Sequence, residues 1–152
     1  EDDKVRAAKL ALRRDMVVQA AVSDRVENVD IYSPGDFSTN ATIDVEAAAH
    51  HPEYRRLHQV KTETLTEILE RCDCPSQFDF LNIDCEGNDF RVLKGLALDR
   101  YAPKVICIEI WESKQGLDGL MTSDIHQYLQ AHEYELRSWA IFSAIYVRRA
   151  SL

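Results

Sequence analysis

Two carboxylates stand where a predicted strand ends. Asp84 and Glu86 follow the apolar run of residues 78–83 and are two positions apart. If the backbone stays extended there, both side chains leave the strand on the same side. Close carboxylates repel each other, so the pKa of one should rise toward the value that a general base needs near neutral pH. We therefore predict that Asp84 and Glu86 line the floor of an active site.

Two other interpretations of this acidic turn stay open at this point. The two carboxylates could hold a divalent cation as oxygen ligands. Alternatively, Asp84 only ends the strand, and residues 86–89 charge and cap the helix that follows. Position in the sequence does not separate the functional role from the structural one.

The elements around the turn predict where its acids lie. Apolar residues recur at helical spacing from Phe90 to Ala97, so a helix should leave directly from the turn. In an open α/β sheet, ligands bind outside the carboxyl ends of the strands, which places the acidic turn at the expected site. Residues 21–24 and Glu109 end two further predicted strands and should reach the same edge of the sheet.

Small residues end the strand predicted at 16–22. Ala21, Val22 and Ser23 would let a flat ring approach the backbone there, although an ordinary strand-to-turn transition is the simpler interpretation. Three histidines, His50, His51 and His58, lie in the segment 37–59, which shows no clean period and has the length of a functional loop or lid. These histidines could supply a base or a metal ligand, but a solvated surface is the favoured interpretation.

Helices and strands alternate along the chain. We predict helices up to about residue 14, from Thr64, over 88–98 and from Ser123, and strands at 16–22, 29–32, 78–83, 105–110, 134–139 and 144–147. This alternation indicates the α/β class, with a mostly parallel sheet and helices on both of its faces. Only a few residues join the last two strands, so they must form an antiparallel hairpin. We expect a single domain over residues 1–152, with a loop at 115–121.

The composition limits the partners of the chain. Its 152 residues carry a formal net charge of -8, which argues against nucleic acid or an anionic membrane as a partner, because both need a basic surface. No apolar run approaches the roughly 20 residues of a membrane span, so the cytoplasm is the expected compartment. Cys72 and Cys74 lack the spacing of zinc ligands and have no matching second pair, so no metal site is predicted.

Taken together, these residues resemble the FkbM-type methyltransferases, which use S-adenosylmethionine. The resemblance lies in residues 20–24, 79–89, 92–96 and 103–109 and covers the chain from about Met16 onward. Its most specific part is an Ile-Asp pair, one further residue, then Glu-Gly, followed by a Val-Leu-Lys-Gly helix. The resemblance implies a Rossmann-like class I methyltransferase fold with a C-terminal antiparallel hairpin.

The resemblance also implies roles for single residues. Ala21, Val22 and Ser23 would border the adenine of S-adenosylmethionine, and Asp84 would face its methionine part. Asp84 or Glu86 would act as the base, or position the acceptor, in methyl transfer to a hydroxyl of a small molecule or glycan.

The chain departs from the family pattern in two ways. Asn82 and Asp89 replace a frequent lysine and a longer acid, and the glycine-rich loop and the ribose-binding acid of the first two strands have no counterpart. The domain is therefore expected to be N-terminally truncated, with an exposed sheet edge through which it could form a homo-oligomer. The alternative function is a non-catalytic fragment or degenerate domain that acts in binding.

A second alternative is a metal-dependent enzyme or a phospho-acceptor receiver domain, because both place acids at strand ends. A receiver domain needs an acidic pair on its first strand and a lysine at the end of a late strand. Here the late strand follows Lys104 and ends in Glu109, which argues against a receiver.

Overall fold

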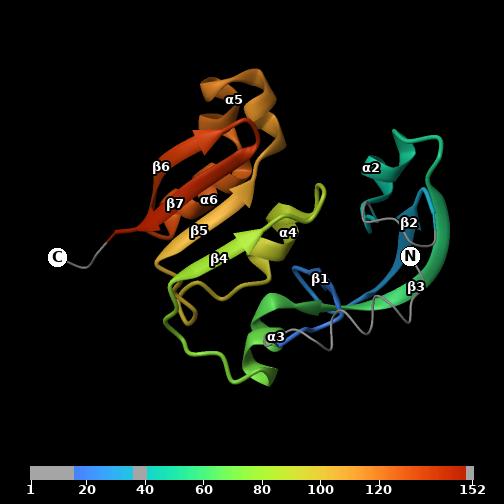
Figure 1. Cartoon of the computed structure of the whole chain (residues 1–152), viewed down its shortest axis with the longest axis horizontal. Coiled ribbons are helices and arrows are strands. Elements are labelled where there is room, and N and C mark those ends of the chain that lie inside the picture. Colours follow the sequence, from blue (N-terminus) through green and yellow to red (C-terminus); the bar gives the residue numbers. More distant parts are fainter. Residues whose placement is uncertain (1–15, 36–40, 150–152) are drawn as a thin grey trace.

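The computed structural model in Figure 1 describes residues 16–35 and 41–149. The helix predicted up to residue 14 lies outside the described residues. The strands are β1 (Ala21–Ser23), β2 (Asn28–Ser33), β3 (Arg55–Thr64), β4 (Phe80–Ile83), β5 (Val105–Glu109), β6 (Tyr134–Ala140) and β7 (Ser143–Arg148). The helices are α2 (Val45–Ala49), α3 (Leu65–Arg71), α4 (Asp89–Lys94), the 3-10 helix η1 (Trp111–Gln115), α5 (Leu117–Thr122) and α6 (Asp124–Ala131).

These strands form two mixed sheets. One has the order β4-β5-β7-β6 and the other the order β1-β3-β2. The α/β class is confirmed. The predicted single, mostly parallel sheet is not found, because the described strands form two sheets with mixed pairing. Only β1–β3 and β4–β5 pair in parallel among the described strands, because β2 and β7 each pair antiparallel with their neighbours. Figure 1 shows the four-stranded sheet and the long β2–β3 ribbon on opposite sides of the molecule, with β1 between them.

The four-stranded sheet brings two acidic strand ends together. Strands β4 and β5 pair in parallel, with Phe80 opposite Val105 and Ile83 opposite Ile108, so Asp84 and Glu109 follow at the same edge. The predicted C-terminal hairpin is confirmed: β6 and β7 run antiparallel, and β7 inserts between β5 and β6.

The hydrophobic core lies on one face of this sheet. It joins inward residues of the strands, such as Ile106, Ile108 and Tyr146, to residues of α4, α5 and α6, such as Leu93 and Leu129. On the opposite face Phe80 is 57% exposed and Ile145 37% exposed. Helices α4, α5 and α6 supply the helical part of this buried cluster, so the prediction of helices on both faces is not met by the described elements that form it.

Local signals mark two helix starts correctly. At α3 the hydroxyl of Thr64 accepts from the Glu67 N–H, and the Glu67 carboxylate accepts from the Thr64 N–H, as the capping-box spacing predicted. At α6 the Ser123 hydroxyl accepts from the His126 N–H at 3.1 Å. None of the described helices has the length and hydropathy needed to cross a membrane.

Three segment predictions were wrong. The strand predicted at 16–22 is only β1, the irregular segment 37–59 contains α2 and the start of β3, and the loop predicted at 115–121 is mostly α5. Strand β3 shows no apolar alternation because half of its ten residues are exposed and only Thr62 is buried, and its pairing with β1 and β2 stabilises it. The secondary structure of these segments depends on tertiary contacts, which a local sequence pattern does not contain.

Candidate functional site

The turn after β4 is tightly folded rather than extended. Glu86 has φ 49° and Gly87 has φ 92°, a left-handed conformation that favours glycine at position 87. Asp89, only 2% exposed, holds the turn: its carboxylate accepts from the Cys85 N–H at 2.9 Å and from the Gly87 N–H at 3.1 Å. The condition for Asp84 and Glu86 to leave a strand on the same side, an extended backbone, is therefore not met.

A first cavity, of about 570 Å³, lies between β1 and this turn. Ala21, Val22, Asp84 and Glu86 line it, although β1 and the turn are some sixty residues apart in sequence. Asp84 and Glu86 are exposed, but they face this hollow. Ser23 does not line it: its side chain is fully buried, and its hydroxyl donates to Asp24 at 3.1 Å.

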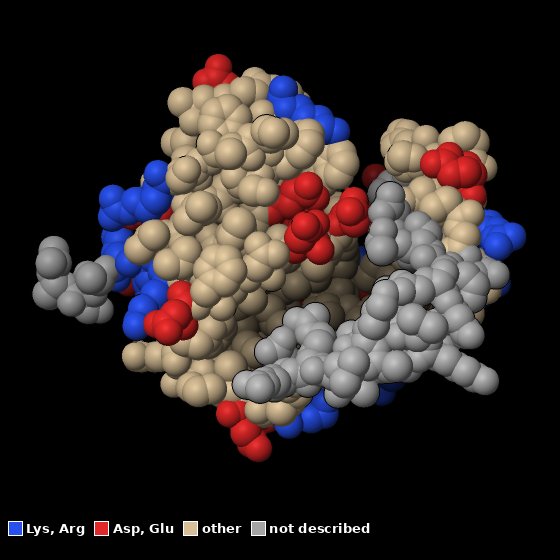
Figure 2. Space-filling view, viewed as in Figure 1, with Lys and Arg blue, Asp and Glu red and all other residues tan. Residues whose placement is uncertain are grey.

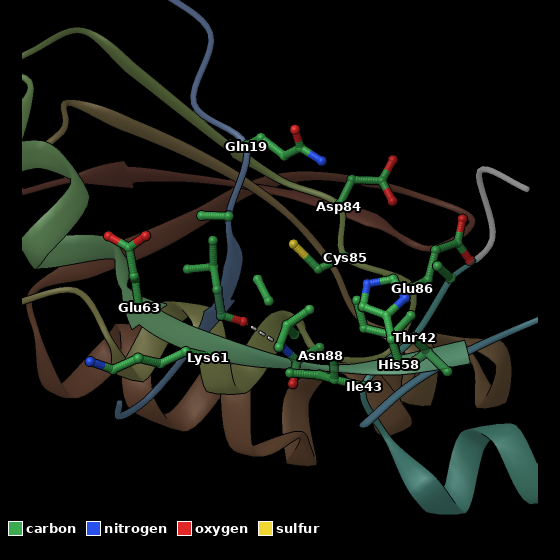
Figure 3. Close-up of a pocket in the computed structure, with 16 residues that line it drawn as sticks. Gln19, Thr42, Ile43, His58, Lys61, Glu63, Asp84, Cys85, Glu86 and Asn88 are labelled. Atoms are coloured by element: carbon green, nitrogen blue, oxygen red, sulfur yellow. Dashed lines mark hydrogen bonds between the residues drawn. The ribbon is translucent and has the colours of Figure 1, made fainter. Parts of the chain in front are cut away.

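Charged groups occupy both ends of the first cavity. Figure 3 shows Asp84 and Glu86 toward one end and Lys61 and Glu63 at the other. His58, exposed as the sequence predicted, also lines this cavity. Lys61 and Glu63 both lie on β3, and the sequence did not predict their role because that strand was not recognised.

Asn88 joins the two walls of the first cavity. Its amide Nδ2 donates to the Val22 carbonyl at 2.8 Å, as the dashed line in Figure 3 shows. The residue is 5% exposed, and its Oδ1 atom has no hydrogen-bond partner within the described part of the chain. The sequence placed Asn88 among residues 86–89, which could cap helix α4, but its side chain makes no cap hydrogen bond, and the contact with Val22, 66 positions away, was not predicted.

Helix α4 is also held against the end of β1 by charge. Arg91 donates to Asp24 at 3.0 Å and to Glu27 at 2.6 Å. Burial tends to raise the pKa of Asp24, but the hydrogen bonds from Arg91 and Ser23 outweigh it and leave that pKa below its ordinary value. The N-terminal end of α4, which follows the acidic turn, is thus fixed relative to β1.

A second cavity, of about 480 Å³, opens beside the first and shares Thr42 and Glu86 with it. Its walls carry three aromatic side chains, Tyr54, Phe90 and Trp111. The acids around it are Glu86, Asp89, Glu109, Glu112 and Asp124, and the exposed His50 and His51 also line it. Glu109, expected as a third acid at this edge, is therefore close to the turn.

Burial raises the pKa of several acidic groups at this edge of the sheet. It raises the pKa of Glu109, a rise that the hydrogen bond from Trp111 opposes and that the charges of Asp89, Asp84 and Glu86 reinforce. The pKa of Asp89 is raised mainly by burial, although the backbone N–H groups that it accepts from oppose this. Burial also raises the pKa of Cys85 to about 11, so its thiol stays protonated at neutral pH.

The described residues contain no group of three or more His, Cys, Asp or Glu side chains arranged to hold a metal ion. The two cavities are lined by carboxylates, aromatic rings, three histidines and one lysine among the described residues. Such groups can bind a polar organic ligand and accept a proton from it.

Comparison with known families gives a match over most of the chain. A family model described as "Methyltransferase FkbM domain" matches residues 3–136. This range contains β1, the acidic turn, α4 and β5, and so includes every element that lines the two cavities. Searches of curated proteins and of solved structures gave no match.

Proposed function

The chain belongs to the FkbM methyltransferase family, and on this basis we propose that it methylates a hydroxyl of a small molecule or glycan with S-adenosylmethionine. The observation that carries the proposal is the first cavity. Folding brings Ala21 and Val22 at the end of β1 to the same hollow as Asp84 and Glu86. A Rossmann-like class I methyltransferase fold is part of the proposal, supported by the parallel β4–β5 pair and the C-terminal hairpin.

The residues of the first cavity suit such a cofactor. Its volume lies within the range of small-molecule sites. The small side chains of Ala20 and Ala21 leave room for a flat ring, and Asp84 and Glu86 offer negative charge to a sulfonium and an ammonium group. Lys61, at the other end, can pair with a carboxylate.

The proposed mechanism divides the work between two carboxylates. Bound S-adenosylmethionine would supply a methyl carbon that a hydroxyl oxygen can attack. Glu86 borders both cavities, so we assign it the proton of that hydroxyl, which its carboxylate oxygen would accept. Asp84 lines only the first cavity and is assigned to orienting the cofactor. Binding in adjoining cavities would align the hydroxyl oxygen with the methyl carbon, and such alignment contributes toward ~7–11 kcal/mol in well-oriented reactions.

The test separates binding from turnover. Calorimetry with S-adenosylhomocysteine measures affinity, and its release during incubation of S-adenosylmethionine with a panel of hydroxylated small molecules and glycans measures turnover. Glu86→Gln keeps the size of the side chain but removes the proton acceptor. It should lower turnover by about 10²- to 10⁴-fold and leave affinity for S-adenosylhomocysteine nearly unchanged. Full activity in this variant would remove Glu86 from the mechanism.

A non-catalytic binding role is the second candidate. It is favoured by one observation: no glycine is among the residues that line the first cavity, whereas a glycine-rich turn allows close backbone approach to such a cofactor. If millimolar S-adenosylmethionine produces no heat of binding, the binding role holds and the enzymatic proposal fails.

The proposed compartment remains the cytoplasm. All four cysteines, Cys72, Cys74, Cys85 and Cys107, are unpaired in the structure. Unpaired cysteines are usual in a reducing compartment, which supports the proposal. Fractionation of cells that express the chain would test it.

A further inference from the structure

The second cavity is a separate hollow next to the first. It holds about 480 Å³, enough for a small organic molecule, and meets the first cavity at Thr42 and Glu86. Glu86 therefore borders both a ligand in the first cavity and a ligand in the second. This is the placement that an acceptor needs if Glu86 takes its proton.

The walls of the second cavity are rigid aromatic surfaces. The Phe90 ring packs edge-on against Tyr128, with 5.7 Å between centroids, and the Trp111 ring stacks on Phe142 at 5.5 Å. Ile125, which is buried, adds an aliphatic contact. Because these rings are already fixed by neighbours, they can bind the apolar body of a ligand at little cost in side-chain entropy.

The rings of this cavity already accept ammonium groups from the protein. The Nζ atom of Lys114 lies 3.8 Å from the Trp111 ring centroid, and that of Lys94 lies 4.7 Å from the Phe90 centroid. Neither lysine lines the cavity. Cations thus find favourable partners in these two rings, as expected from the charge distribution of aromatic side chains.

The charge inside the cavity is one-sided. Among the described residues, five carboxylates line it, whereas no lysine or arginine does, and the basic groups on its walls are His50 and His51. Figure 2 shows Asp and Glu side chains gathered beside the central hollow, with no Lys or Arg side chain among them. Two of the five acids, Asp89 and Glu109, are held by hydrogen bonds within the protein, whereas the carboxylates of Glu112 and Asp124 have no partner within the described part of the chain.

The charges decide between classes of acceptor. An anionic acceptor would be repelled by the carboxylates, and a neutral one would gain no charge attraction from them. A cation would compensate them while its apolar part packs on the rings. We propose that the second cavity binds the methyl acceptor and selects a cationic amino alcohol, in which an ammonium group and an apolar body accompany the hydroxyl. The assignment as acceptor rests on the proposed function.

The experiment compares two probes that differ in charge. 2-Amino-1-phenylethanol carries a ring, a hydroxyl and an ammonium group, and its N-acetyl derivative is the neutral counterpart. Binding of each to the full 152-residue chain is measured by calorimetry, with and without S-adenosylhomocysteine. The amine should bind about five- to tenfold more tightly than the neutral probe, and added salt should reduce this preference.

Two variants locate the effect. The double variant Glu109→Gln/Glu112→Gln removes two charges from the cavity and should bring the two probes to within about twofold of each other. Asp73→Asn is the matched control: Asp73 is an exposed acid outside both cavities, and asparagine tolerates its positive φ of 50°. This control should keep the full preference. Melting curves show that both variants remain folded.

Each outcome decides one proposal. Equal binding of the two probes, tighter binding of the neutral probe, no binding of either, or an unchanged preference in the double variant overturns the inference. If S-adenosylhomocysteine binds but the amine is not preferred, the proposed function stands without this acceptor. If the amine is preferred but S-adenosylhomocysteine does not bind, the charge selectivity stands and the methyltransferase proposal fails.

Discussion

Gly95 determines how closely α4 approaches β1. Its φ of -72° is open to any residue, so its backbone conformation does not require glycine. The space does: a Cβ atom at position 95 would lie 2.3 Å from the carbonyl oxygen of Ser23. We predict that Gly95→Ala pushes these backbones apart and lowers the free energy of unfolding by about 1–3 kcal/mol, measured by urea denaturation.

The matched control for this substitution is Gly35→Ala. No atom lies within 4 Å of a Cβ at position 35, and its φ is not positive. Its stability should therefore stay within about 0.5 kcal/mol of the parent or rise slightly. Equal losses in the two variants would mean that the contact with Ser23 does not matter.

Asn88 should link stability to cofactor affinity. Asn88→Asp replaces the donor to the Val22 carbonyl with a carboxylate oxygen, which repels that carbonyl. We predict a lower melting temperature and a weaker affinity for S-adenosylhomocysteine, measured by calorimetry under conditions where the variant is folded. Asn28→Asp, at an exposed position on β2, should change neither. An affinity unchanged in Asn88→Asp would show that this bridge does not shape the cavity.

At the scale of single residues, the sequence indicated the residues that line the first cavity but not the residues that hold its walls together. Apolar runs marked the strand ends in the sequence, so these residues could be named in advance. In the structure a shared cavity is lined by Asp84, Glu86, Ala21 and Val22. The roles of Asn88 and Gly95 were not predictable in the same way. Both depend on backbone carbonyls in β1, more than sixty positions earlier, and no local pattern encodes such a contact.

At the scale of elements, local chemistry was predictable and long-range pairing was not. The capping box of α3 and the β6–β7 hairpin depend on residues close in sequence, and both were predicted. Strand β3 was missed, because only one of its ten residues is buried and because it is stabilised by β1 and β2 on either side. The split into two mixed sheets follows from that pairing and was missed with it.

The ion pairs between α4 and the segment after β1 predict a pH dependence. The folded-state pKa of Asp24 lies below its ordinary value of 3.8, so its pairing with Arg91 stabilises the fold above that value and is lost as the pH falls through the folded pKa. We predict that Arg91→Gln lowers the melting temperature at neutral pH by about 2–4 °C. The difference from the parent should shrink in acid.

A control for this prediction is Arg100→Gln, which removes an exposed ion pair with Glu70 in α3. Such surface pairs contribute little, so its melting temperature should stay close to that of the parent at every pH. A deficit in Arg91→Gln that persists unchanged in acid would assign the role of Arg91 to packing instead of charge.

At the scale of the whole molecule, the edge of the four-stranded sheet predicts association. Among the described strands, β4 pairs on one side only, and Phe80 on this strand is 57% exposed. We predict that light scattering shows a mass that rises with concentration and that Phe80→Glu keeps the chain monomeric. Leu117→Glu, at an exposed position in α5, should associate like the parent. A parent that is monomeric at every concentration rejects association through this edge.

The two sheets should also differ in local stability. Within the described residues, fully buried hydrophobic side chains of the strands belong to the four-stranded sheet, whereas Thr62 is the sole buried residue of β3. Amides of Ile106 and Tyr146 should therefore exchange hydrogen most slowly, near the rate of global unfolding, and amides of Val29 and Val60 should exchange faster through local opening. Native-state exchange measured by NMR tests this, and equal protection of both sheets would instead indicate one cooperative unit.

Because β1 carries one wall of the first cavity, saturating S-adenosylhomocysteine should slow exchange at Val22 more than at Ile106.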